Sequence, residues 1–186
     1  MSLASQKQIQ MDFNTEFRRT YLGAAPHTLA TGLIWLISAA LGQWGTKTQS
    51  IIFFIAAGTF IFPFGELLRK LMQAPNLMSQ ENSLPRLFML LAFTIPLSYP
   101  LIYLACKGNT NFFYPAFSVL VGAHYLPFIY GYRMPVFGIM SGLLVSQGLI
   151  CSIYYPESFA LSAIITGIIL VFFGLVNYSR IKKELV

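Results

Sequence analysis

Six long apolar segments dominate this chain and limit what it can fold into. They cover residues 26–44, 51–68, 86–106, 112–132, 135–155 and 159–179. Each has about 18 to 21 residues, close to the ~20 that an α-helix needs to cross the ~30 Å hydrocarbon core of a bilayer. Only 10% of the residues are charged, against roughly a quarter in a typical soluble domain. The sequence therefore predicts an all-α, polytopic integral membrane protein: one domain of six transmembrane helices arranged as three hairpins.

The positions of the basic residues predict how these helices are oriented. If the N-terminus is cytoplasmic, ten of the 12 Lys and Arg residues lie on the inner side, and only Lys47 and Lys107 lie on the outer side. Such an asymmetry follows the positive-inside rule. We therefore expect a multi-pass protein of the cell inner (plasma) membrane with both termini in the cytoplasm. The net charge of +6 then indicates topology and contact with anionic lipid head groups, not binding to nucleic acid.

Residues 1–25 are predicted to form a cytoplasmic segment with a short amphipathic interfacial helix. Ile9, Phe13, Phe17 and Tyr21 recur every fourth residue, which places them on one face of that helix. Two placements fit this pattern. The aromatic face can lie in the inner membrane interface, or it can pack on the cytoplasmic ends of the bundle, and we expect a mixture of the two. At the other end of the chain, a short charged cytoplasmic tail is expected after the last span.

Four prolines inside the apolar segments predict kinks, and they are Pro63, Pro96, Pro100 and Pro127. Proline has no N–H, so the carbonyl four residues earlier loses its helical partner. A broken helix in a membrane needs protein or water around the freed groups. We therefore expect the span with Pro96 and Pro100 to lie inside the bundle rather than against lipid, and we expect a kink or a bound water at Pro63.

His124 is the strongest single candidate for a functional residue. It lies about two residues from the centre of its segment, or ~3 Å from the midplane, where an ionisable side chain is costly and is usually functional. One hypothesis is that the imidazole, which lies beside the carbonyl freed by Pro127, binds substrate or couples movement of the helices to its own protonation. The alternative is a neutral histidine that locks the bundle through a hydrogen bond to Tyr99, Gln147 or Glu66.

Four more polar residues are candidates for substrate binding or proton coupling: Glu66, Gln147, Tyr99 and Tyr125. Glu66 has two interpretations, because Arg69 and Lys70 follow in the next turn: it pairs with one of them, or it faces an internal cavity. For Gln147 the alternatives are a hydrogen bond to a neighbouring helix and a contact with substrate. Next to Gln147, Gly138, Gly142 and Ser146 stand four residues apart, a spacing that lets another helix approach closely.

Signatures of enzymes and metal sites are missing from the sequence. It has no P-loop, no His-Glu-x-x-His and no pair of cysteines with metal-ligand spacing. We therefore expect no catalytic residue, no metal and no cofactor, and an enzyme is the least favoured function. Cys106 and Cys151 lie toward the outer ends of their spans, where either a disulfide or simple packing is conceivable.

A motif of the fourth apolar segment also occurs 64 residues earlier. Its two copies are Gly58, Pro63, Phe64 and Arg69, and Gly122, Pro127, Phe128 and Arg133. Both copies lie in spans that run inward, so they would form a parallel repeat. His124 and Tyr125 belong to the second copy alone.

The run Gly122 to Phe128, GAHYLPF, resembles a family of small bacterial multi-span membrane proteins with no assigned function. The resemblance covers one span and the number of spans. It implies a fold of this kind and no mechanism.

Two functional hypotheses follow. The first is a carrier or permease-like protein for a small molecule or ion, with a polar cavity near the midplane around His124. The alternative is a non-transporting accessory or scaffold subunit that binds partner helices through its small-residue stripes.

Overall fold

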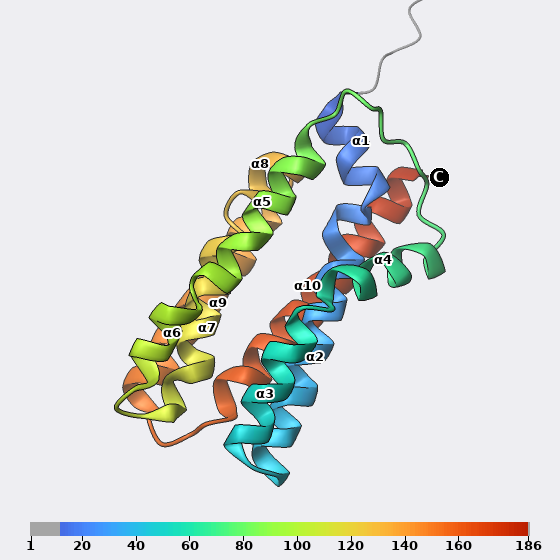
Figure 1. Cartoon of the computed structure of the whole chain (residues 1–186). Coiled ribbons are helices and arrows are strands. Elements are labelled where there is room, and N and C mark those ends of the chain that lie inside the picture. The colour runs from blue at the N-terminus through green and yellow to red at the C-terminus, as the bar shows by residue number, and fades with distance from the viewer. Residues whose placement is uncertain (1–11, 186) are drawn as a thin grey trace, which may run out of the picture.

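The computed structural model describes residues 12–185, and all of its regular elements are helices (Figure 1). In chain order they are α1 (Phe13–Thr20), η2 (Leu22–Ala24), α2 (Ala25–Trp44), α3 (Lys47–Gly58), α4 (Ile61–Leu71), α5 (Leu84–Leu97), α6 (Tyr99–Cys106), η3 (Thr110–Phe112), α7 (Phe113–His124), α8 (Phe128–Tyr132), α9 (Val136–Tyr154) and α10 (Leu161–Leu185). No strand occurs between residues 12 and 185, so the all-α prediction is confirmed.

Several of these helices are long and apolar enough to cross a membrane. Four stretches qualify by length and composition, and they are Leu22–Trp44, Leu84–Cys106, Val136–Tyr154 and Leu161–Leu185. The pair α3 and α4 adds a fifth if it counts as one span, because a bend of 61° separates its two helices. These stretches coincide with five of the six predicted segments and indicate a membrane protein.

The remaining predicted segment, residues 112–132, differs from the expected single helix. It is divided into α7, with 12 residues, and α8, with five. The turn between them ends at Pro127, which is the N-cap of α8. Because proline cannot donate a backbone hydrogen bond, the α7 helix does not continue through this position. Length and composition therefore support four or five spans among the described helices.

The other predicted kinks also lie at or near helix breaks. Pro63 is the third residue of α4, just after the break that ends α3. Pro96 lies inside α5 and Pro100 in the first turn of α6, on either side of Ser98, where the two helices meet. Pro63 and Pro100 lie in the first turn of a helix, where a missing N–H costs least, whereas Pro96 lies inside α5, where its missing N–H leaves the carbonyl of Ala92 without its helical partner. Pro96 and Pro100 are both exposed, so the prediction that their span lies inside the bundle is wrong.

Two helix pairs form the centre of the molecule. Helix α2 lies along α10, and α7 lies along α9 (Figure 1). A Cβ atom at Gly32 of α2 would lie 3.1 Å from the carbonyl oxygen of Gly167 in α10. Likewise, a Cβ at Gly122 of α7 would lie 3.0 Å from the carbonyl oxygen of Ser141 in α9. Small residues thus bring the backbones together, as is common between helices in membranes.

The two ends of the molecule differ in charge. Helix α1, the end of α4 and the end of α10 lie at one end, whereas α3 begins and α6 ends at the other (Figure 1). Nine of the 11 basic residues within 12–185 belong to the first end, which we call the basic end. The exceptions are Lys47, the first residue of α3, and Lys107, directly after α6.

Helix α1 packs on the basic end of the bundle. Phe17 is only 2% exposed, and its ring lies 4.8 Å from that of Phe88 in α5 and 4.7 Å from that of Tyr132 in α8. Arg18 pairs with Glu184 of α10 at 3.0 Å. Of the two placements for the amphipathic segment, the structure therefore has packing on the bundle. Ile9 lies outside the described residues.

The stretch Leu84–Cys106, made of α5 and α6, is much less enclosed than the others. In an apolar segment of 18 residues within this stretch, only 6% of the residues are buried, against 44% to 61% in the corresponding segments of the other three long stretches. It is fixed near its two ends, where Phe88 contacts the ring of Phe128 at 4.8 Å and Ile102 is buried. Between these points Ile95 and Tyr99 pack against the core, while the apolar side chains of the other face are exposed, among them Leu90, Phe93 and Leu97.

Candidate functional site

Three ionisable side chains meet where the start of α2 faces α4. Glu66 Oε2 accepts a hydrogen bond from Arg69 Nε at 2.8 Å, and Glu66 Oε1 lies 3.6 Å from His27 Nε2. The side chains of His27 and Glu66 are only 21% and 23% exposed. We call these three residues the His27 cluster. It lies beyond the 61° bend between α3 and α4.

The local sequence explains why these groups converge. Pro26 occupies the first turn of α2, a position that suits its missing N–H, and sets His27 at the start of the helix. Glu66 and Arg69 are three residues apart and therefore neighbours on one face of α4. The residue beside Glu66 is Gly65, and a Cβ atom there would collide with the imidazole of His27. Only glycine lets α4 come this close.

The histidine and the glutamate face each other without a hydrogen bond. His27 Nε2 and Glu66 Oε1 are both buried and have no hydrogen-bond partner within the described chain. The surrounding groups are the ring of Tyr21, 6.0 Å from His27 and 5.7 Å from the Arg69 guanidinium, and the ring of Phe62, 5.5 Å from His27. A proton on His27 would convert the contact with Glu66 into an ion pair, which makes the cluster able to respond to protonation.

His124 lies at the end of α7, against α5. Its Nδ1 atom is 3.4 Å from Thr94 Oγ1, and its ring is 5.5 Å from that of Phe128. The Thr94 hydroxyl also donates to the carbonyl of Leu91 at 2.6 Å. The imidazole is therefore beside two helix breaks, the α7–α8 turn and the α5–α6 junction that follows Thr94.

Gln147 is enclosed by hydrogen bonds from three helices. Its amide nitrogen donates to Ser118 of α7 and, at 2.7 Å, to Thr166 of α10. Its carbonyl oxygen accepts from Ser162 at 3.2 Å and from the thiol of Cys151 at 3.6 Å. The whole amide is thus used inside the protein, as the helix-to-helix interpretation expects. Both Cys151 and Cys106 are free thiols.

The two tyrosine candidates are part of aromatic packing. The Tyr99 ring lies 5.8 Å from that of Phe117. Tyr125 is buried, and its ring stacks on Phe137 at 6.1 Å with an interplanar angle of 8°. Tyr125 sits in the turn between α7 and α8, next to His124.

The predicted site residues do not converge on a single cavity. Glu66 belongs to the His27 cluster, Gln147 to the α7–α9–α10 contact and His124 to the α5–α7 contact. Within residues 12–185, no hydrogen bond or ion pair joins any two of these three. The prediction that Glu66 pairs with Arg69 agrees with the structure.

The contact between His27 and Glu66 was not predicted, although the sequence held a clue to it. Both residues lie about 20 residues from the turn between α2 and α3, so the two arms of one helical hairpin bring them to the same height. Residues 12–185 contain no group of three or more His, Cys, Asp or Glu that could hold a metal ion.

Comparison with known proteins gives one match. A family model described as a family of unknown function matches residues 11–180. No curated protein and no solved structure matches the chain. The family match spans every helix described above except the last residues of α10.

Proposed function

The chain belongs to this family of unknown function, DUF7010, and we propose that it is a multi-pass carrier of a small molecule or ion in the cell inner membrane. The observation that carries the proposal is the buried contact of His27 with Glu66 beside a bent helix pair. Ionisable groups inside a membrane protein are costly and usually serve a function. The finer assignments below rest on this proposal.

We assign six membrane crossings. Five of them are the long stretches named above, and α7 and α8 together form the sixth, although neither helix is long enough to cross a membrane alone. Backbone hydrogen bonds continue through the turn between them: Leu126 N–H donates to Ala123 O, Phe128 N–H to Tyr125 O and Ile129 N–H to Leu126 O, each at 3.1 Å. Such continuity matters because an unpaired backbone group in hydrocarbon costs several kcal/mol. The concentration of basic residues at one end supports a cytoplasmic location for both termini.

Protonation of His27 supplies a means of moving α4. When the imidazole carries a proton, its attraction to Glu66 strengthens and holds α4 against α2. When the proton leaves, Glu66 keeps only Arg69 as a partner, and that residue lies on α4 itself. The break before α4 then acts as a hinge, which is how discontinuous helices serve many transporters.

His124 is the proposed substrate contact. It lies beside Thr94, and the carbonyl of Thr94 accepts a hydrogen bond from the Ser98 hydroxyl at 2.7 Å. The imidazole of His124 and the hydroxyl of Thr94 therefore lie together near two helix breaks. Polar side chains beside broken helices are typical of substrate sites in transporters.

Uptake into proteoliposomes tests the proposal. The full chain is reconstituted with a pH-sensitive dye inside the vesicles, and Na⁺, K⁺, neutral amino acids, monocarboxylates and sugars are added one at a time. We expect at least one of these solutes to change the internal pH with the native chain and not with Glu66→Gln or His27→Gln. Glu184→Gln is the matched control, because it removes a carboxylate at the same end of the molecule but outside the cluster.

A carrier role would be refuted if none of these solutes changes the internal pH, or if Glu66→Gln and His27→Gln both behave like the native chain. Circular dichroism of each variant in the same vesicles shows whether it remains folded.

A second candidate, an accessory or scaffold subunit, is favoured by one face of α9. A Cβ atom at Gly142 would meet nothing within 4 Å, whereas one at Gly148 of the same helix would lie 2.7 Å from the carbonyl oxygen of Pro115. Gly142 and Ser146 therefore lie on an open surface that could admit a partner helix. Purification in mild detergent discriminates: a partner that is lost with Gly142→Leu supports this candidate, and a protein that stays alone and monodisperse contradicts it.

A further inference from the structure

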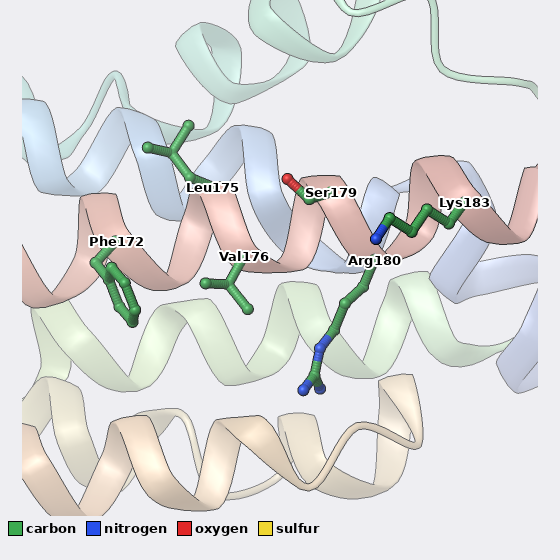
Figure 2. Close-up of a pocket in the computed structure, with 6 residues that line it drawn as sticks. All are labelled: Phe172, Leu175, Val176, Ser179, Arg180 and Lys183. Carbon is green, nitrogen blue, oxygen red and sulfur yellow. The ribbon is translucent and has the colours of Figure 1, made fainter.

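A groove runs along α10 at the basic end of the molecule. It has a volume of about 390 Å³ and is lined by Phe172, Leu175, Val176, Ser179, Arg180 and Lys183 (Figure 2). These residues form two rows along the helix, and neighbouring residues in a row are four positions apart in the sequence. Figure 2 shows Phe172, Val176 and Arg180 in one row, and it shows the side chain of Lys183 running back along the helix toward Arg180.

The groove is apolar over most of its length and cationic at one end. Phe172 and Leu175 are more than half exposed, so the apolar part is open to the surroundings of the protein. The cationic part begins at Ser179, one turn later, and contains Arg180 and Lys183. This order matches the change from hydrocarbon to head groups that a helix meets as it leaves a bilayer.

Within residues 12–185, Arg180 and Lys183 have no ion-pair partner, unlike Arg18 nearby. Arg18 pairs with Glu184 at 3.0 Å, and Lys182 donates to the Tyr178 hydroxyl at 3.3 Å. No carboxylate among residues 12–185 forms an ion pair with Arg180 or Lys183. Their charge is therefore available to an external anion, and a guanidinium binds phosphate oxygens through two parallel hydrogen bonds.

From this arrangement we infer that the α10 groove is a binding site for one phospholipid with an anionic head group. An acyl chain lies along Phe172, Leu175 and Val176. The head-group phosphate contacts Arg180 and Lys183, and the Ser179 hydroxyl is a further donor at the same level. Basic grooves at the membrane surface of other proteins hold anionic lipids by the same combination of chain burial and charge. The inference is independent of transport, because none of these residues belongs to the His27 cluster or contacts His124.

Thermal unfolding of the delipidated full chain in detergent tests the site. We expect dioleoyl phosphatidylglycerol to raise the Tm by about 5 °C more than the same concentration of dioleoyl phosphatidylcholine. The double variant R180Q/K183Q should lose this difference, and Val176→Trp, which fills the groove and keeps both charges, should lose it too. Lys182→Gln is the matched control, because Lys182 lies on the same turn and does not line the groove. It should behave like the native chain.

Three results would overturn the inference. The first is an equal Tm increase with both lipids, and the second is an unchanged difference in R180Q/K183Q. The third is the same Tm increase with inorganic phosphate as with phosphatidylglycerol, because the groove would then bind a free anion. If R180Q/K183Q unfolds too early to be melted, native mass spectrometry in the cold gives a second readout. One phosphatidylglycerol should stay bound to the native chain and to Lys182→Gln, and none to R180Q/K183Q.

Discussion

Lys47 Nζ donates a hydrogen bond to Asn111 Oδ1 at 2.7 Å, and the two residues stand 64 positions apart in the chain. Ser50 and Tyr114, which share a hydrogen bond of 2.5 Å between their hydroxyl groups, have the same separation. This is also the offset of the repeated motif that contains Pro63 and Pro127. Corresponding positions of two parallel repeats meet in this way when the repeats face each other across a common axis.

The contact between Ser50 and Tyr114 should contribute measurable coupling between α3 and α7. Each of Ser50→Ala and Tyr114→Phe is expected to lower the free energy of unfolding by about 1 kcal/mol. A double-mutant cycle, measured by unfolding in mixed detergent micelles, should give a coupling energy of about 0.5 to 1 kcal/mol. Additive effects would show that the two hydroxyl groups do not interact.

Gly65→Ala should disrupt the contact of α4 with α2. The added methyl group collides with the imidazole of His27, so α4 must move away from α2, at a cost of about 1 to 3 kcal/mol in unfolding free energy. Gly142→Ala is the control, because its methyl group meets open space. It should leave the stability of the isolated chain unchanged or slightly higher. Equal losses in the two variants would contradict the close packing at Gly65.

Replacing Gln147 separates a structural role from a substrate contact. Gln147→Ala removes the partner shared by Ser162, Thr166 and Ser118, and a buried polar group without a partner costs about 1 to 3 kcal/mol. We therefore expect lower stability in detergent but unchanged uptake per folded molecule. Loss of uptake in a variant of native stability would instead assign Gln147 to substrate binding.

The loop after α4 should detach from α1 in acid. Burial raises the pKa of the Glu16 carboxyl, but hydrogen bonds from Ser79 and Asn82 together lower it by more, so the pKa lies below its ordinary value of 4.5. A carboxyl with a lowered pKa stabilises the fold above its ordinary pKa, and this stabilisation is lost as the pH falls through the lowered value.

Hydrogen exchange of residues 76–83, measured between pH 7 and pH 3, tests the role of Glu16. After correction for the intrinsic pH dependence of exchange, protection should fall in the native chain below about pH 4.5. In Glu16→Gln it should be low throughout. Protection that is independent of pH in the native chain would contradict this role of Glu16.

Cysteine labelling checks the proposed orientation. In a background without Cys106 and Cys151, a cysteine at Lys47 or Lys107 should react with a membrane-impermeant maleimide added to intact cells. A cysteine at Arg180 should react only after the cells are opened. The reverse pattern would place both termini outside.

Much of the fold follows from patterns that need no partner to be recognised. Apolar length predicts where α2, α5–α6, α9 and α10 lie, because a bilayer demands about 20 apolar residues whatever the neighbours are. Proline positions predict where helices break, since the missing N–H is a local property of the chain. The pairing of Glu66 with Arg69 is local for the same reason.

The arrangement of the candidate site was less predictable, because it depends on which helix faces which. Nothing near Gln147 in the sequence reveals that Ser118 and Thr166 will satisfy its amide. His124 has an apolar sequence neighbourhood, yet its Nδ1 atom lies 3.4 Å from the hydroxyl of Thr94, which is 30 residues away in the chain. The contact of His27 with Glu66 likewise forms only when the turn between α2 and α3 brings the start of α2 against α4.

The stretch of α5 and α6 contacts the bundle along one face, through Phe88, Ile95, Tyr99 and Ile102, and its other face is exposed, and this shapes how it can respond to force. A helix held along one face alone is displaced more easily than a helix that has neighbours on every side. The stretch is also interrupted at Ser98, where α5 ends and α6 begins. Changes in the thickness or lateral pressure of the surrounding bilayer would therefore act more directly on α5 and α6 than on an enclosed helix, and the contact of Thr94 with His124 would pass their displacement to α7.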